Sequence, residues 1–262
     1  MSQPNSDYLN CSHDVGLVKE KFFTYDQPFE MEGGFLDEFT LAYETYGELN
    51  QSADNAILIC HALTGDHHVA GVYSENDAKP GWWNHVVGPN KPIDTNKFFV
   101  ICSNCLGACK GSTGPTTKKA SGQSFGTSFP DLSINDMVRA QKILVDHLGV
   151  SKLFAVVGGS MGGMQALQWV VKYPKFSEKA IIIAATAQHT VQTIAFNEAG
   201  RRSIMGDPCW KEGEYECKEG PRNGLAVARM MAHITYLSDQ GMEDKFGGEK
   251  RLDVESDFEF SV

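Results

Sequence analysis

A serine set between glycines at the end of an apolar run constrains this chain more than any other stretch. Residues 154–157 read Phe-Ala-Val-Val, and Gly158, Ser160 and Gly162 follow with the spacing G-x-S-x-G. A short β-branched run suits a buried parallel strand, and the two glycines allow the chain to reverse sharply into a helix. Apolar residues then recur at helical spacing until Pro174, which breaks a helix. The pattern predicts a strand, a nucleophile elbow and a helix.

The elbow also predicts a chemical role for Ser160. A serine in such a turn is exposed at a helix N-terminus, where backbone N–H groups favour the negative charge that an attacked carbonyl develops. The competing interpretation is the glycine-rich turn of a nucleotide-binding fold. It is disfavoured because Ser160 stands where G-x-G-x-x-G has its second glycine, and no acidic residue closes a following strand. We therefore interpret Ser160 as a nucleophile.

A second loop is in the right place to complete the site. Residues 55–60 form a short apolar run typical of a strand inside a parallel sheet, and His61-Ala62-Leu63 follow it. In elbow enzymes, one oxyanion N–H comes from the residue after the nucleophile and the other from a loop after an earlier strand. We expect the backbone N–H groups of Leu63 and Met161 to form the oxyanion hole.

Two groups of residues could instead suggest a metal site. The first has the spacing C-x2-C-x3-C: Cys102, Cys105 and Cys109. The second is a set of histidines that follows residues 55–60: His61, His67 and His68. Neither group has a further ligand at a usual metal-binding spacing. We expect free thiols in the first group, loop-structuring histidines in the second, and no bound metal or cofactor.

Length and charge limit the class of protein. The 262 residues can bury one large core, so one α/β domain with an insertion is expected rather than two independent domains. A formal charge of −10 argues against nucleic acid and anionic membranes as partners. The polar residues 1–7 do not resemble a signal peptide, and the seven cysteines indicate free thiols in a reducing compartment. We expect a cytoplasmic protein.

The apolar pattern predicts an α/β sheet followed by a helical region. Strands are expected over 22–31, 35–46, 55–60, 97–102 and 179–185, besides the elbow strand. A hairpin or meander is expected at Gly33-Gly34, a flexible lead-in over 1–20, and a long connection over 66–97 packed down by Trp82 and Trp83. Residues 1–188 would form the core and 189–262 a helical lid region.

Helices are expected at three places besides the elbow. A capping box that begins at Ser133 predicts a helix that ends at Gly149. Residues 189–204 and 222–238 mix small, charged and apolar residues in patterns typical of helices. No further strand of comparable quality follows residue 185.

Several stretches together resemble the homoserine O-acetyltransferase family, and they occur in the same order. They are L-I-C-H-A-L-T-G at 58–65, K-P-G-W-W at 79–83, G-S-T-G-P at 111–115, the elbow at 158–165, A-F-N-E at 195–198, and residues 225–238. The resemblance implies an α/β-hydrolase fold, in which a mostly parallel sheet has helices on both faces and a helical lid. It also implies an enzyme that makes O-acetylhomoserine from acetyl-CoA and L-homoserine, its small-molecule substrates, on the way to methionine, and that is a homodimer at full length.

The resemblance also assigns roles to residues. It implies that Ser160 is acylated, that Leu63 and Met161 supply the oxyanion N–H groups, and that Arg229 holds the carboxylate of the amino acid. An arginine fork suits a carboxylate. The sequence departs from the family at Met231-Ala232, where a glycine usually precedes the histidine, and at Cys105, which replaces an aliphatic residue.

The rest of the triad is harder to place. In this fold, the acid and the histidine follow the serine, on loops after two late strands. Only one expected strand follows Ser160, and Asp207 and His233 have the right order but fall in the helical part. The resemblance therefore predicts an N-terminal part that lacks the last strands and the triad acid and base, and that is inactive alone. The alternatives are a succinyl donor, a serine esterase on the same scaffold, or a truncated product that only binds.

Overall fold

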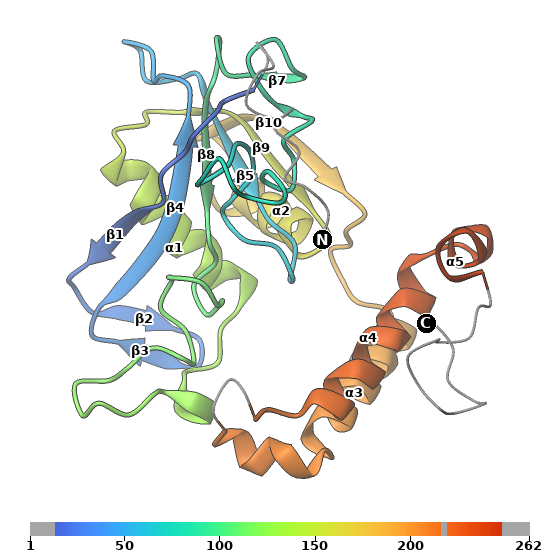
Figure 1. The fold of residues 1–262 in the computed structure, drawn as a ribbon. Coiled ribbons are helices and arrows are strands. Elements are labelled where there is room, and N and C mark those ends of the chain that lie inside the picture. Colours follow the sequence, from blue (N-terminus) through green and yellow to red (C-terminus); the bar gives the residue numbers. More distant parts are fainter. Residues whose placement is uncertain (1–13, 216–218, 248–262) are drawn as a thin grey trace. The chain divides into compact units, whose positions relative to one another are not determined.

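The computed structural model describes residues 14–215 and 219–247, and the chain divides into two compact units. The first unit is Met1–Ala187 and the second is Gln188–Val262. The first contains the sheet and two long helices, and the second contains helices (Figure 1).

A six-stranded sheet forms the centre of the first unit. Its order is β1-β4-β8-β5-β9-β10. The strands are β1 (Lys21–Tyr25), β4 (Phe39–Tyr46), β8 (Phe99–Ser103), β5 (Ala56–Cys60), β9 (Leu153–Gly159) and β10 (Ser177–Ile183). The β1–β4 and β4–β8 pairs are antiparallel, whereas β8, β5, β9 and β10 run parallel. The expected α/β class with a mostly parallel sheet is confirmed.

The two faces of this sheet are covered differently. The described helices of the unit are α1 (Ile134–His147), α2 (Met161–Lys172) and the short 3-10 helix η2 (Gly126–Ser128). Leu58 of β5 packs in one core with Val138 of α1 and Trp169 of α2. The next residue, Ile59, packs in the opposite core with Val69 of the long connection. No described helix contributes to this second core, so the expectation of helices on both faces is not met by the described residues. Successive strand residues point to opposite faces, so the continuous apolar run of β5 fills both cores.

The capping box predicted at the start of α1 is confirmed. The Ser133 Oγ accepts a hydrogen bond from the Asp136 N–H at 3.2 Å, and the Asp136 carboxylate accepts from the Ser133 N–H at 3.1 Å. Asp136 also accepts from the Glu32 N–H at 3.3 Å and from Arg139 at 3.2 Å. The cap therefore joins the start of α1 to the hairpin between β2 (Phe29–Met31) and β3 (Gly34–Leu36).

The aromatic runs near the N-terminus form shorter strands than expected. The run 22–31 divides into β1 and β2, and the run 35–46 divides into β3 and β4. Pro28 lies at the first division and has no N–H to donate to a strand ladder. The β2–β3 hairpin turns at Gly33, as expected, whereas β1 pairs with β4.

The expectation of a flexible lead-in over residues 1–20 is wrong for its described part. Residues 1–13 lie outside the described residues. Beyond them, the Val18 N–H donates to the Val72 carbonyl at 2.9 Å, and Lys91 Nζ lies 2.5 Å from Asp14 Oδ1. Residues 14–18 therefore pack against the long connection.

The connection over residues 66–97 contains little regular structure. Its only described strands are two-residue pieces, β6 (Val87–Gly88) and β7 (Ile93–Asp94), which pair in parallel. The rings of Trp82 and Trp83 lie 5.1 Å apart, and Trp82 Nε1 donates to the Asp66 carbonyl at 3.0 Å. The two tryptophans hold this connection in place, as predicted.

The regular structure in the described residues of the second unit is helical. The described helices are α3 (Val191–Met205), the 3-10 segment η3 (Pro208–Gly213), α4 (Arg222–Tyr236) and α5 (Asp239–Phe246). The first and third correspond to the expected helices, whereas α5 was not predicted. A β-carbon at Gly224 would lie 2.3 Å from the Ser203 carbonyl oxygen, so α3 and α4 approach closely there. Among the described residues, no helix has both the length and the apolar character needed to cross a bilayer.

Candidate active site

The backbone around Ser160 is that of a strained turn. β9 ends at Gly159 and α2 begins at Met161, so Ser160 is the single residue between strand and helix. Its φ of 55° and ψ of −123° form a combination that residues with a side chain rarely adopt. The Ser160 N–H donates to the Ile183 carbonyl of β10 at 2.9 Å. The turn is therefore held by the neighbouring strand, and Ser160 remains exposed at the N-terminus of α2.

The glycines around Ser160 are required because backbone atoms approach them closely. A β-carbon at Gly158 would lie 2.1 Å from the Gly162 carbonyl oxygen, and one at Gly162 would lie 2.0 Å from the Cys60 carbonyl oxygen. At Gly159 the nearest atom would be 3.9 Å away, which is ordinary contact. The G-x-S-x-G spacing therefore reflects how tightly the first turn of α2 packs on the ends of β5 and β9.

The candidate oxyanion residues lie at the same edge of the sheet as Ser160. β5 and β9 are parallel neighbours, and Cys60 is paired with Gly158 at their carboxyl ends. Leu63 follows β5, and Met161 follows Ser160 at the start of α2. In open α/β sheets, ligands bind at the carboxyl edge. The structure brings Ser160, Leu63 and Met161 to that edge.

His61, one of the histidines expected to structure a loop, is buried between two backbone groups. The Cys105 N–H donates to His61 Nε2 at 3.0 Å, and His61 Nδ1 lies 2.8 Å from the Ala62 carbonyl oxygen. Burial lowers the pKa of His61, although the bond to Ala62 opposes the shift. A buried imidazole with both nitrogens engaged is suited to fixing a loop.

A chain of buried amides behind the elbow was not predicted from the sequence. Trp169 Nε1 donates to Gln141 Oε1 at 2.7 Å, and Gln141 Nε2 donates to Gln165 Oε1 at 2.6 Å. The Cys105 thiol lies 3.5 Å from the same Gln165 oxygen. This network joins α1, α2 and the loop after β8 beneath the site. One signal was present: Gln141 stands among apolar residues at the helical spacing 138, 141, 145.

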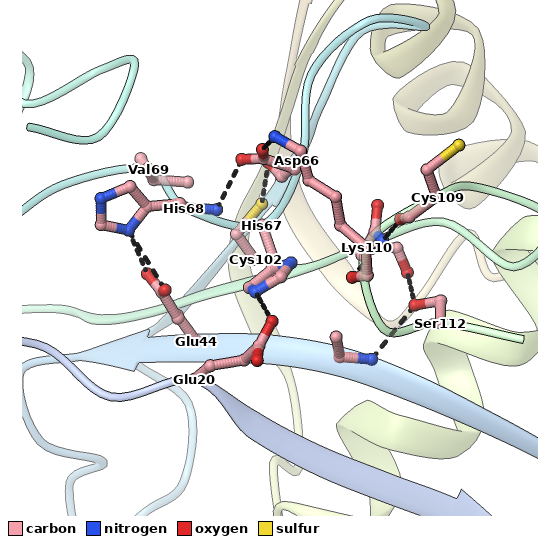
Figure 2. Close-up of polar contacts among 12 residues, drawn as sticks. Glu20, Glu44, Asp66, His67, His68, Val69, Cys102, Cys109, Lys110 and Ser112 are labelled. Carbon is pink, nitrogen blue, oxygen red and sulfur yellow. Dashed lines mark hydrogen bonds and ion pairs between the residues drawn. The ribbon is translucent and has the colours of Figure 1, made fainter. Parts of the chain in front are cut away.

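A buried carboxylate fixes the segment that follows the oxyanion loop. Tyr46 Oη donates to Glu44 and accepts from the Val69 and Ala70 N–H groups at 3.0 and 3.1 Å. His68 Nδ1 lies 3.2 Å from both Glu44 oxygens, as Figure 2 shows. Glu44 is 1% exposed, so these side chains rather than water satisfy its oxygen atoms. Burial, and then the Glu44 charge, raise the pKa of Tyr46.

Two further contacts between a carboxylate and a basic side chain surround this segment in Figure 2. His67 Nε2 lies 2.9 Å from Glu20 Oε1, and Lys110 Nζ pairs with Asp66. Burial raises the pKa of Asp66, but the hydrogen bonds from Lys110 and from the His68 backbone outweigh it, and the pKa is lowered overall. The three pairs occupy carboxylates that sequence analysis did not identify, because their partners are distant in sequence.

The cysteines of the C-x2-C-x3-C pattern lie in different environments. Cys102 and Cys105 are buried, whereas Cys109 is exposed. Burial raises the pKa of Cys105 to about 12, and that of Cys102 is also raised by burial. Within the described ranges, no group of three His, Cys, Asp or Glu residues is arranged to hold a metal ion. The buried thiols therefore behave as small apolar side chains.

The remaining candidate residues belong to the second unit. Arg229 is exposed on α4. Asp207 accepts from the Gly224 N–H and the Cys209 N–H, both at 2.8 Å, and these bonds lower its pKa. His233 lies in the last turn of α4, with its ring centroid 5.5 Å from that of Phe246. Asp207 thus caps backbone N–H groups within its own unit.

Comparison with known sequences identifies the relatives of this chain. The profile of the alpha/beta hydrolase fold family matches residues 55–257. The homoserine O-acetyltransferase of Methanococcoides burtonii is 53% identical over 250 residues, which cover 95% of this chain and 51% of that protein. That of Solidesulfovibrio magneticus is 54% identical over 249 residues, with 92% and 63% covered. The chain spans about half the length of the first relative.

Comparison with solved structures also finds a homoserine O-acetyltransferase, together with an esterase. The homoserine O-acetyltransferase from Bacillus anthracis superposes with a TM-score of 0.84 at 33% identity, over 89% of this chain and 64% of that chain. Esterase E22 superposes with a TM-score of 0.81 at 35% identity, over 92% and 67%. The chain therefore belongs to the α/β-hydrolase fold family and, by sequence, groups with the homoserine O-acetyltransferases.

Proposed function

We propose that this chain carries the nucleophile of an acyltransferase that moves an acetyl group from acetyl-CoA to the hydroxyl of L-homoserine, on the route to methionine. The observation that carries the proposal is the strained turn at Ser160, placed at the N-terminus of α2. Its relatives named homoserine O-acetyltransferase are 53% and 54% identical to this chain. An exposed serine in that position is built to attack a carbonyl.

The proposed reaction has two steps. Ser160 Oγ attacks the thioester carbonyl carbon, the N–H groups of Leu63 and Met161 stabilise the resulting oxyanion, and the C–S bond breaks to release CoA as the free thiol. The homoserine hydroxyl then attacks the serine ester, and O-acetylhomoserine leaves as Ser160 regains its proton. Both steps require a general base. Among the described residues, no histidine is hydrogen-bonded to Ser160, so the base is not assigned.

Arg229 is proposed to hold the carboxylate of homoserine. A guanidinium matches a carboxylate through two parallel hydrogen bonds, which a lysine cannot reproduce. We expect Arg229→Lys to raise the KM for homoserine and to leave the acylation of Ser160 by acetyl-CoA unchanged. An unchanged KM would contradict this role.

The test of the function follows the release of CoA thiol. It uses the whole natural polypeptide that contains these residues, alongside the 262-residue chain, with Ser160→Ala as the control. We expect thiol release from acetyl-CoA to depend on added L-homoserine and to disappear in the control. Thiol release that is indifferent to homoserine would favour a hydrolase, and faster turnover of succinyl-CoA would contradict the acetyl donor.

A second candidate is a serine esterase, which the likeness to esterase E22 favours. The two activities share the acylated serine and differ in whether water or an alcohol attacks the ester. The two acceptors compete for one intermediate, so the ratio of acetate to O-acetylhomoserine formed from acetyl-CoA distinguishes them. We expect O-acetylhomoserine to predominate when homoserine is present at millimolar concentration.

A further inference from the structure

The side chain of His61 contacts one peptide of the proposed oxyanion loop. His61 directly follows β5 and is 1% exposed, whereas Leu63, two residues later, has an exposed side chain. The imidazole is held between two backbone groups, the Cys105 N–H at Nε2 and the Ala62 carbonyl at Nδ1. No water is needed to satisfy either nitrogen.

These two partners define the tautomer of the ring. A backbone N–H can only donate, so Nε2 must carry its lone pair toward Cys105. A carbonyl oxygen can only accept, so Nδ1 must carry the proton that it donates to Ala62. His61 is therefore the neutral Nδ1–H tautomer. A second proton on Nε2 would face the Cys105 N–H and break the arrangement.

The contact with Ala62 bears directly on the proposed oxyanion donor. The Ala62 carbonyl and the Leu63 N–H belong to the same peptide unit, and in a planar trans peptide they point in opposite directions. The carbonyl is held by His61 at 2.8 Å and by the Gly65 N–H at 2.9 Å. Fixing the carbonyl toward the ring thus fixes the Leu63 N–H on the opposite side.

The ring itself rests on a fixed frame. Cys105 is buried, and its thiol lies 3.5 Å from Gln165 of α2, which also accepts from Gln141. Its loop is therefore tied to the same helix that carries the elbow. These contacts connect the two halves of the proposed oxyanion hole. Met161 is the first residue of α2, and the Ala62–Leu63 peptide is hydrogen-bonded to His61 through the Ala62 carbonyl.

We propose that His61 is a positioning residue that orients the Leu63 N–H toward the oxyanion, and that it is not the general base. This role rests on the proposed acylation of Ser160. A base would need a free nitrogen near Ser160 Oγ. Both His61 nitrogens are engaged elsewhere, and no hydrogen bond joins His61 to Ser160 in the described part of the chain.

A matched pair of variants separates the two bonds of the ring. In His61→Asn, the side-chain amide can donate to Ala62 but cannot reach Cys105. In His61→Gln, the longer side chain can accept from the Cys105 N–H but has no donor near Ala62. His61→Asn therefore keeps the hydrogen bond to Ala62, which orients the proposed oxyanion peptide. His61→Gln keeps the hydrogen bond from Cys105, which anchors the side chain.

The readout is the rate of Ser160 acylation by p-nitrophenyl acetate, measured on the whole natural polypeptide together with the midpoint of unfolding. Loss of one oxyanion donor costs about 10²–10³-fold in rate, and Gly65 still holds the peptide in part, so we expect His61→Gln to lose about tenfold or more in kcat. We expect His61→Asn to lose less, although it is no more stable than His61→Gln. KM should change little in either variant.

The other outcomes overturn the proposal. If the two rates fall in proportion to the two stabilities, His61 is only structural. If both variants also lose the limb of the pH–rate profile that reports a base, His61 is that base. In the folded protein, nitrogen NMR of the imidazole should show a protonated Nδ1, and the opposite tautomer would disprove the geometry. An enzyme that is acylated but does not acetylate homoserine would refute the proposed function and leave this role intact.

Discussion

Gly162 in the first turn of α2 lies directly against Cys60 at the end of β5. A β-carbon on Gly162 would come 2.0 Å from the Cys60 carbonyl oxygen, a distance that no repacking of side chains relieves because the atom belongs to the backbone. The position of the elbow helix, and hence of Ser160, depends on this contact.

We expect Gly162→Ala to destabilise the protein by more than about 3 kcal/mol or to prevent folding, because the helix must move off the sheet. The matched control is Gly159→Ala, where the new β-carbon has its nearest neighbour at 3.9 Å. We expect the free energy of unfolding of the control to lie within about 1 kcal/mol of that of the parent protein. Denaturant unfolding measures both, and equal stabilities for the two variants would contradict the contact.

The strain at Ser160 predicts that a variant can gain stability while it loses activity. With φ at 55°, Ser160 occupies a region in which glycine is favoured and other residues cost roughly 1–3 kcal/mol. We expect Ser160→Gly to exceed Ser160→Ala in stability by about 1 kcal/mol, since glycine relieves the strain but adds entropy to the unfolded chain. Both variants lose the nucleophile. A glycine variant no more stable than the alanine variant would show that the turn is unstrained.

Local patterns in the sequence predicted much of the fold. The apolar runs of β5, β9 and β10 and the capping box at Ser133 are each encoded within a few neighbouring residues, and the structure contains all of them. The runs 22–31 and 35–46 were predicted as single strands, although Pro28 interrupts the first run and has no N–H for a strand ladder. The contacts of residues 14–18 were not predicted either, because they involve residues far along the chain. The Val18 N–H, for example, donates to the Val72 carbonyl.

The positions of the candidate site residues could be predicted where the signal is local. The G-x-S-x-G spacing places Ser160, and the order of strand and loop places Leu63. The partner of His61, by contrast, is the N–H of Cys105, which lies 44 residues away, and no local pattern encodes such a pair. The buried Glu44 was missed for the same reason, since its partner His68 comes from a different segment.

The buried amide network predicts a cost for removing one of its members. Gln141→Leu leaves the Trp169 N–H without its acceptor and takes a donor from Gln165, so we expect a loss of about 1–3 kcal/mol in the free energy of unfolding. The control is Gln168→Leu, because the Gln168 side chain is half-buried and makes a long hydrogen bond of 3.4 Å to Asn135. We expect less than about 0.5 kcal/mol there. Chemical denaturation distinguishes the two, and equal losses would argue against the network.

The neutral state of His61 predicts a pH dependence of stability. Burial lowers its pKa in the folded protein, while in the unfolded chain the pKa is about 6.5. Between these two values the unfolded state binds more protons, so the free energy of unfolding falls as the pH falls below about 6.5, by at most about 1.4 kcal/mol per pH unit. The nearby Asp66 charge opposes this shift and the nearby His67 adds to it.

The comparison of wild type with His61→Gln isolates this contribution, because every other titrating group is present in both proteins. We expect the stability advantage of wild type to be constant from about pH 8 down to pH 6.5 and to shrink below that. Thermal or urea unfolding at intervals of half a pH unit measures the difference. An advantage that stays constant down to pH 5 would mean that His61 binds a proton equally well in the folded and unfolded states, and that the neutral tautomer assigned to the oxyanion loop is wrong.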